Sequence, residues 1–238
     1  MKQLLPLLAL ASLFTSTVSA LDTAALERAM ANPDRPQADK DRDVSRQGPA
    51  VLDFMGVEAG MTALDINASG GWYSEVLSYA VGASGKVYMQ NRANVTEGRN
   101  ADAVVDKAAR LSNIERWEKP ISDLPNNSID FAITGLNFHD FHNSDPQAAQ
   151  GILAQIKAVL KPGGILAVID HEGTVGADNQ ALHRISFEAA VKALLQGGFA
   201  LVGSSEILDN SADDHSVGPF DASLGRNTDR IVLKLMKL

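Results

Sequence analysis

The chain has 238 residues, with 29 Asp and Glu against 21 Lys and Arg, and its formal net charge is −8 at pH 7. Nucleic acids and anionic lipids bind basic patches, so we expect neither as a partner. The sequence contains no cysteine, which excludes disulfides and thiolate chemistry.

Residues 1–20 have the order of a secretory signal peptide: Lys2, an apolar run from Leu4 to Phe14, and a small-residue cleavage site at Val18–Ala20. A membrane anchor is the alternative. The apolar run is shorter than the ~20 residues that a spanning helix needs, and Pro6 interrupts it. We therefore expect an exported protein, periplasmic or secreted, with no membrane contact after cleavage of the signal.

Residues 21–238 are predicted to form a single domain, in which residues 21–48 are a polar N-terminal arm. Leu26, Ala29 and Met30 indicate a short amphipathic helix in this arm. The charged residues of the arm are interpreted as a solvated face with local ion pairs. They are Asp34, Arg35, Asp39, Asp41, Arg42, Asp43 and Arg46.

Beyond Pro49 the chain alternates apolar, strand-like runs with helical patterns. Strands are predicted at residues 62–66, 85–89, 114–117, 129–134, 165–170, 200–207 and 230–237. Helices are predicted at residues 72–80, 101–111, 147–160 and 180–196. Such alternation indicates βαβ units, whose right-handed crossovers produce a parallel sheet covered by helices on both faces.

The turn after the first predicted strand has the composition of a nucleotide-type cofactor site. Asp65 and Ile66 end the strand, and Asn67-Ala-Ser-Gly-Gly71 then opens into a helix. Small residues let backbone N–H groups approach a ligand, and the N-terminus of a helix adds a positive dipole. We therefore expect the N–H groups near Ser69 to face a cofactor. A plain strand-to-helix connection is the alternative interpretation.

Three further segments accompany this turn: Gly70-Gly-Trp-Tyr73, Asn137-Phe-His-Asp140 and Ala212-Asp-Asp-His215. Together with the Lys161-Pro-Gly-Gly-Ile-Leu166 turn, their order resembles the class I S-adenosylmethionine-dependent methyltransferases, and more narrowly a group of exported predicted methyltransferases. The resemblance runs from about Arg35 to the C-terminus. It implies a Rossmann-like, doubly wound α/β fold with a mostly parallel seven-stranded sheet, whose last strand is antiparallel, and S-adenosyl-L-methionine as the cofactor.

The resemblance also implies which residues bind the cofactor. They are Asp65, Asn67, Ala68, Ser69, Gly70, Gly71 and Asn91. The sequence departs from the family here, because Asn67 and Ser69 replace two of the three glycines of the motif, and Ser69 places a Cβ and a hydroxyl where the family leaves room. Asn91 replaces the acid that accepts both ribose hydroxyls. The position of the family's adenine-side acid falls near Pro120, so the adenine contact is unassigned.

Asn137, His139 and Asp140 are the predicted catalytic residues, because the loop after the fourth strand opens at the carboxyl edge of the sheet. A neutral imidazole at His139 takes a proton from a hydroxyl or amine as a methyl group arrives. Asn137 and Asp140 orient the substrate or the ring. The alternative is that these side chains make structural hydrogen bonds only.

Three other histidines fall near the same rim. His171 follows the fifth strand, His183 opens the next predicted helix, and His215 lies in the long connection before the last strand. Histidines and carboxylates bind divalent metals, but no short ligand spacing is present and no metal is assigned. Trp72 and Tyr73 are predicted to pack against the arm rather than to cover a ligand.

Two functions follow from these patterns. The first is methyl transfer to an unidentified small molecule. The second is an exported small-molecule-binding protein that keeps the cleft without catalysis. The family resemblance favours methyl transfer. The altered turn, Asn91 and the predicted export favour the binding protein, since the methyl donor is made in the cytoplasm.

Overall fold

The computed structural model describes residues 20–92, 94, 98 and 100–238. The predicted signal peptide therefore lies outside the described residues, apart from Ala20. Every helix in the described part of the chain falls short of the length and apolar character needed to cross a membrane.

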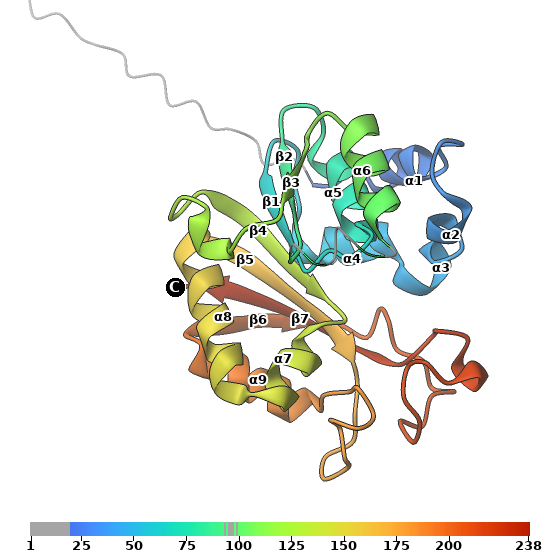
Figure 1. Cartoon of the computed structure of the whole chain (residues 1–238), viewed down its shortest axis with the longest axis vertical. Coiled ribbons are helices and arrows are strands. Elements are labelled where there is room, and N and C mark those ends of the chain that lie inside the picture. The colour runs from blue at the N-terminus through green and yellow to red at the C-terminus, as the bar shows by residue number, and fades with distance from the viewer. Residues whose placement is uncertain (1–19, 93, 95–97, 99) are drawn as a thin grey trace, which may run out of the picture.

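A seven-stranded sheet forms the centre of the domain (Figure 1). Its strands are β1 (Thr62–Ile66), β2 (Lys86–Gln90), β3 (Ile114–Trp117), β4 (Ile129–Gly135), β5 (Leu160–His171), β6 (Phe199–Ser204) and β7 (Arg230–Lys237). Their spatial order is β3-β2-β1-β4-β5-β7-β6, and β7 runs antiparallel to both of its neighbours. The predicted Rossmann-like, doubly wound α/β fold with its antiparallel last strand is thus confirmed.

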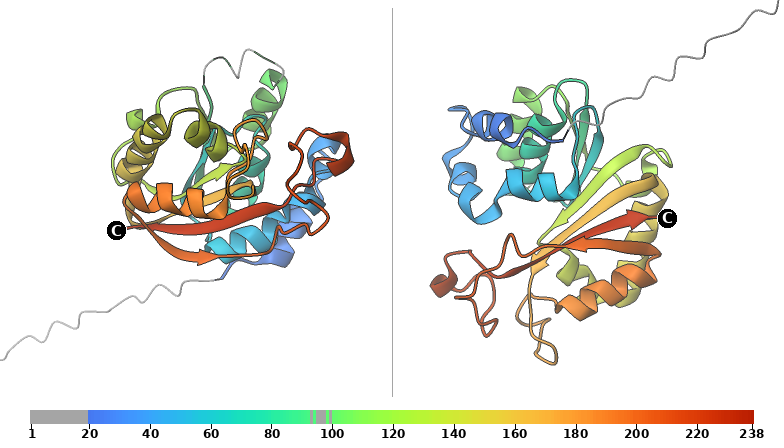
Figure 2. Two further views of the ribbon diagram at one scale, coloured as in Figure 1. Left: turned by 90° about the horizontal axis from the view of Figure 1, so that it is seen from below. Right: turned by 180° about the vertical axis from the view of Figure 1, so that it is seen from behind.

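Helices cover both faces of the sheet (Figures 1 and 2). The helices are α1 (Thr23–Met30), α2 (Gln37–Lys40), α3 (Asp43–Arg46), α4 (Gly48–Met55), α5 (Trp72–Val81), α6 (Ala101–Arg110), α7 (Phe138–Ser144), α8 (Pro146–Val159) and α9 (Phe187–Gln196). Side chains alternate across a strand, so Ala63 of β1 joins the apolar cluster beneath α5 and Leu64 joins the one beneath α8. The core is therefore divided into two layers by the sheet.

The predicted bounds of β1, β3 and β7 are confirmed, and two differences elsewhere bear on the site. The predicted loop after β4 contains helix α7, which begins after Asn137. The helix predicted at residues 180–196 begins only at Phe187, because Ile185 pairs with Glu172 in an isolated bridge and the Ser186 side chain caps the helix. The prediction that His183 opens this helix is therefore wrong.

The N-terminal arm is attached by buried ion pairs, so its interpretation as a solvated face is wrong for two residues. Arg35 and Asp39 are only 2% and 7% exposed. Arg35 pairs with Asp43 at 2.6 Å, and the Asp39 carboxylate accepts from Lys107 of α6 at 2.6 Å. The Trp72 indole donates to the Asp39 carbonyl at 3.1 Å, which confirms that Trp72 packs against the arm.

Glu75 of α5 is the partner of the arm on the domain side. Its buried carboxylate accepts from Arg110 at 3.0 Å and from the Tyr79 hydroxyl at 2.9 Å. The Lys107 ammonium and the Arg35 guanidinium each lie 3.8 Å from its second oxygen. The Lys107 ammonium lies near two buried acids, Asp39 and Glu75. Its removal therefore leaves negative charge uncompensated in the protein interior.

The Lys107→Met variant tests this attachment. We expect the free energy of unfolding to fall by about 3–5 kcal/mol, because the buried carboxylates of Asp39 and Glu75 lose the cation that lies near both of them. Denaturant titration measures the loss. Lys86→Met is the matched control: Lys86 is 43% exposed in its pair with Glu115, so the expected loss is at most about 1 kcal/mol. Equal losses in the two variants would contradict the assigned role of the buried pair.

Candidate functional site

The turn between β1 and α5 has a left-handed backbone at alternate positions. The φ angles are 50° at Asn67, 53° at Ser69 and 75° at Gly71. A Cβ at Gly71 would lie 2.5 Å from the Met89 sulfur, so glycine is required there by both backbone and space. Asparagine tolerates this conformation, whereas serine adopts it at a cost of about 1–2 kcal/mol. The turn therefore keeps a glycine-type backbone with two non-glycine residues.

The backbone N–H groups of this turn bind the end of β2. Asn67 N donates to the Gln90 side-chain oxygen at 3.0 Å, and Ala68 N donates to the Gln90 carbonyl at 2.8 Å. Ser69 N donates to the Asn91 side-chain oxygen at 2.8 Å, and the Asn91 amide donates back to the Ser69 carbonyl at 3.1 Å. The expectation that the N–H groups near Ser69 face a cofactor is therefore wrong, because Gln90 and Asn91 already satisfy them.

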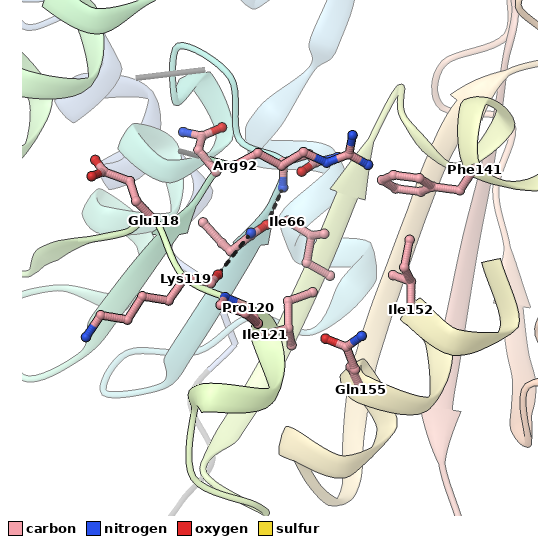
Figure 3. A pocket seen from close by; sticks show the side chains of 12 residues that line it. Ile66, Arg92, Glu118, Lys119, Pro120, Ile121, Phe141, Ile152 and Gln155 are labelled. Carbon is pink, nitrogen blue, oxygen red and sulfur yellow. Dashed lines mark hydrogen bonds between the residues drawn. The ribbon is translucent and has the colours of Figure 1, made fainter. Parts of the chain in front are cut away.

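A cavity of about 320 Å³ opens beyond the carboxyl ends of β1, β2 and β3 (Figure 3). Ile66, Pro120, Ile121 and Ile152 provide apolar walls. Figure 3 shows the Arg92 side chain extending towards Phe141, and the guanidinium carbon lies 5.6 Å from the centre of that ring. The cavity thus combines an apolar wall with a cation at its side.

A second cavity of about 540 Å³ adjoins the first and shares residues such as Asn67 and Phe141 with it. It extends to Ser69, Asn137 and Asp140. Both cavities lie where the strand order reverses between β1 and β4, which is the usual ligand position in doubly wound sheets.

Asp170, at the end of β5, fixes the geometry around His139. Its buried carboxylate accepts from His139 N at 2.6 Å, from the His139 ring nitrogen Nδ1 at 2.7 Å, and from His171 N at 2.8 Å. A carboxylate only accepts, so the hydrogen of the neutral His139 ring is on Nδ1 and the lone pair is on Nε2. That lone pair lies 3.2 Å from the Asp140 carboxylate.

The histidines of this region are arranged around His139. The His183 ring nitrogen Nδ1 lies 3.1 Å from the same oxygen of Asp140. The His171 ring packs next to the His139 ring, with ring centres 5.7 Å apart, and its Nδ1 is hydrogen-bonded to the Thr228 hydroxyl at 2.6 Å. His139, Asp140 and His183 therefore form one group, which we call the rim cluster. His215 is not part of this cluster, because its Nε2 is hydrogen-bonded to the Asp229 carboxylate at 2.9 Å.

The imidazole rings of His139 and His171, both buried, have pKa values shifted in opposite directions. Burial lowers the pKa of His139, but the hydrogen bond to Asp170 and the charges of Asp170 and Asp140 outweigh it, so this pKa lies above its ordinary value. Burial, followed by the charges of His139 and Arg230, lowers the pKa of His171 to about 2. His171 is therefore a neutral ring in the wall behind His139.

The position of His183 is set by its neighbour Arg184, whose side chain is fully buried. One guanidinium nitrogen of Arg184, Nη2, donates to both carboxylate oxygens of Asp213, at 2.8 and 2.9 Å, and the other two donate to the carbonyls of Glu172 and Val217. The late Ala-Asp-Asp-His segment thus holds the turn that carries His183. The sequence patterns did not reveal this contact, because Arg184 stood in a segment predicted to be helical.

Comparison with known proteins finds no matching family model. The demethylmenaquinone methyltransferase of Staphylococcus aureus (strain MRSA252) is 29% identical over 126 residues, which cover 50% of this chain and 47% of that protein. The match thus spans about half the length of this relative.

Solved structures match over most of the chain. A SAM-dependent methyltransferase from Aquifex aeolicus has a TM-score of 0.62 at 22% identity, and the match covers 91% of this chain and 99% of that one. A Burkholderia thailandensis 1,6-didemethyltoxoflavin-N1-methyltransferase, solved with 1,6-didemethyltoxoflavin and S-adenosylhomocysteine, has a TM-score of 0.59 at 18% identity, covering 83% and 80%. The chain has the class I methyltransferase fold.

Within this methyltransferase fold, Asp65 ends β1 beside the turn. It is buried and accepts from the Ser74 hydroxyl at 2.6 Å. Burial raises the pKa of Asp65 to about 6, although the Ser74 hydrogen bond and the charge of Arg46 oppose the shift. The folded state therefore holds this proton more tightly than the unfolded chain does.

A stability measurement against pH tests this assignment. An acid whose pKa is raised by folding loses stability as the pH rises through that pKa. We expect the unfolding free energy of the wild type, minus that of Asp65→Asn, to fall by about 2–3 kcal/mol between pH 4 and pH 7. Urea titrations across this range measure the difference. If it stays constant with pH, the carboxyl ionises alike in the folded and unfolded chains.

Proposed function

We propose that this protein transfers a methyl group from S-adenosyl-L-methionine to an unidentified small molecule. The observation that carries the proposal is the continuity of the two cavities, which joins an apolar pocket at the strand-order reversal to Asp140 of the rim cluster. Similarity of the fold to methyltransferases, one of them solved with S-adenosylhomocysteine, supports it.

The residues present fit an adenosyl group. Ile66, Ile121 and Ile152 offer apolar contact for a purine, and Asn91 stands at the end of β2 where the ribose would lie. The other proposed cofactor residues are Asp65 of β1 and, in the turn, Asn67, Ala68, Ser69, Gly70 and Gly71. Gln90 and Asn91 accept hydrogen bonds from the N–H groups of Asn67, Ala68 and Ser69. In this proposal the turn therefore accommodates the cofactor by its shape, and these three N–H groups donate no hydrogen bond to it.

The proposed acceptor side is formed by Asn137, His139 and Asp140. When bound, the cofactor supplies an electrophilic methyl group. The Asp170 carboxylate fixes the His139 ring with its Nε2 lone pair towards Asp140, and in the proposed reaction this nitrogen receives the proton of an acceptor hydroxyl or amine held beside Asp140. Asp140 lines the second cavity, where it orients the acceptor. The Asn137 amide donates to the Gly135 carbonyl at 2.8 Å and supports the start of α7.

We also propose that residues 1–20 direct export, as in the group of exported predicted methyltransferases that the chain resembles, and that the mature protein is periplasmic or secreted. The charged, apolar and small-residue order of the leader supports this proposal. The excess of acidic residues supports a small-molecule substrate rather than a nucleic acid.

Calorimetric titration with S-adenosylhomocysteine and S-adenosyl-L-methionine tests cofactor binding. We expect one molecule to bind per chain. Ile152→Trp should weaken binding by at least about tenfold, because Ile152 lines both cavities and an indole fills space that the ligand needs. Leu195→Trp is the matched control, since Leu195 is exposed on α9. Absence of heat at millimolar ligand would instead support a small-molecule-binding protein without methyl transfer.

The role of His139 is tested with the His139→Ala variant. We expect release of S-adenosylhomocysteine to fall by about 10²–10⁴-fold over a panel of small hydroxyl and amine acceptors, with cofactor affinity unchanged. His142→Ala is the control, because His142 lies on the same helix but outside the rim cluster. A fully active, metal-free His139→Ala protein would remove His139 from the proposed mechanism.

A further inference from the structure

We propose that the rim cluster binds one divalent transition-metal ion, through His139 Nε2, Asp140 Oδ1 and His183 Nδ1. One ligand atom from each of the three side chains lies within 4.8 Å of the others. This inference goes beyond methyl transfer, since binding of the ion requires only these three groups.

The spacing of the cluster suits a shared ion. Asp140 Oδ1 lies 3.2 Å from His139 Nε2 and 3.1 Å from His183 Nδ1. Ligand atoms that are each about 2.0–2.1 Å from a metal are separated by about 2.8–3.0 Å along the edges of an octahedron and by about 3.3–3.4 Å along those of a tetrahedron. The two separations from Asp140 Oδ1 lie between these values, and the two histidine nitrogens are within 4.8 Å of each other. Small rotations of the exposed Asp140 and His183 side chains therefore bring all three ligand atoms around one ion.

The tautomer of His139 also suits a metal ligand. Because His139 Nδ1 donates to Asp170, its Nε2 directs a lone pair at a carboxylate oxygen. A proton or a metal ion between these two atoms relieves the repulsion of their lone pairs, and a bound metal ion would take the place of the proton. A histidine whose second nitrogen donates to a carboxylate is the usual arrangement of a metal-bound histidine, because it fixes the tautomer and increases the basicity of the ligating nitrogen.

The cluster is held in place from two sides. Asp170 fixes His139 on α7, and the buried Arg184–Asp213 pair fixes the turn that carries His183. Two ligands thus come from one helix and the third from a turn 43 residues later. Metal sites with rigid supports on each ligand lose little entropy when the ion binds.

The outer side of the cluster is open. The Asp140 and His183 side chains are 56% and 47% exposed, whereas His139 is buried. Three protein ligands with open positions are typical of sites where the ion also binds water or a substrate. Because Asp140 lines the second cavity, a molecule bound in that cavity lies beside the proposed metal site.

The ligand chemistry selects the class of ion. Two imidazole nitrogens and one carboxylate oxygen suit first-row transition metals such as zinc, cobalt or iron, whereas magnesium and calcium prefer oxygen ligands throughout. The ion and an acceptor's proton compete for the same lone pair of His139, so the imidazole acts as a base only in the metal-free protein.

Titration of metal-free protein with Co²⁺, in the absence of cofactor, tests the site by visible absorption and calorimetry. We expect one ion per chain, with absorption bands typical of nitrogen and oxygen ligands. His183→Ala and Asp140→Ala, which change exposed side chains, should weaken binding by more than about 100-fold. Asp170→Asn, which alters only the support of His139, should weaken it by about 10–100-fold.

His142→Ala is the matched control and should bind Co²⁺ like the wild type, since His142 lies on α7 outside the rim cluster. Circular dichroism confirms the fold of each variant. The proposal is overturned if fewer than one ion binds per chain, if His183→Ala binds as tightly as the wild type, or if Mg²⁺ displaces Co²⁺ at equal concentration. Cofactor binding is measured separately on metal-free protein, so either proposal can fail without the other.

Discussion

The proposed acceptor site depends on one buried carboxylate, that of Asp170. A buried charge is costly unless donors surround it, and Asp170 has three of them, two from His139 and one from His171. These bonds join the end of β5 to the first turn of α7. The orientation of the His139 ring follows from this junction, and the Nε2 lone pair on its far side is what both proton transfer and metal binding require.

Much of the fold follows from local sequence patterns. β1 is a short, mostly apolar run, and β3 begins with Ile114 and ends with Trp117, each with turn residues nearby, so their bounds could be predicted from the residues themselves. The attachment of the arm could not, because Asp39 and Lys107 are 68 positions apart in the sequence and each resembles an ordinary surface charge. Burial of such a pair is decided by tertiary packing, which periodicity does not report.

The sequence predicted where the candidate site lies in the fold, but not which side chains come together in the rim cluster. His139 and Asp140 were predicted to lie at the carboxyl edge of the sheet, and they do. The grouping with His183 depends on a left-handed turn, with φ of 51° at His183, and on the buried guanidinium of Arg184. Neither has a sequence signature. The role of Asn91 was equally hidden, since an amide that binds the backbone of Ser69 looks the same in sequence as one that awaits a ribose.

The pairing of Arg184 with Asp213 makes the long connection between β6 and β7 part of the rim. Because Arg184 also donates to the Val217 carbonyl, the connection and the His183 turn form one structural unit outside the sheet (Figure 2). Insertions or exchanges within this connection can then reshape the entrance to the site while the parallel strands stay intact.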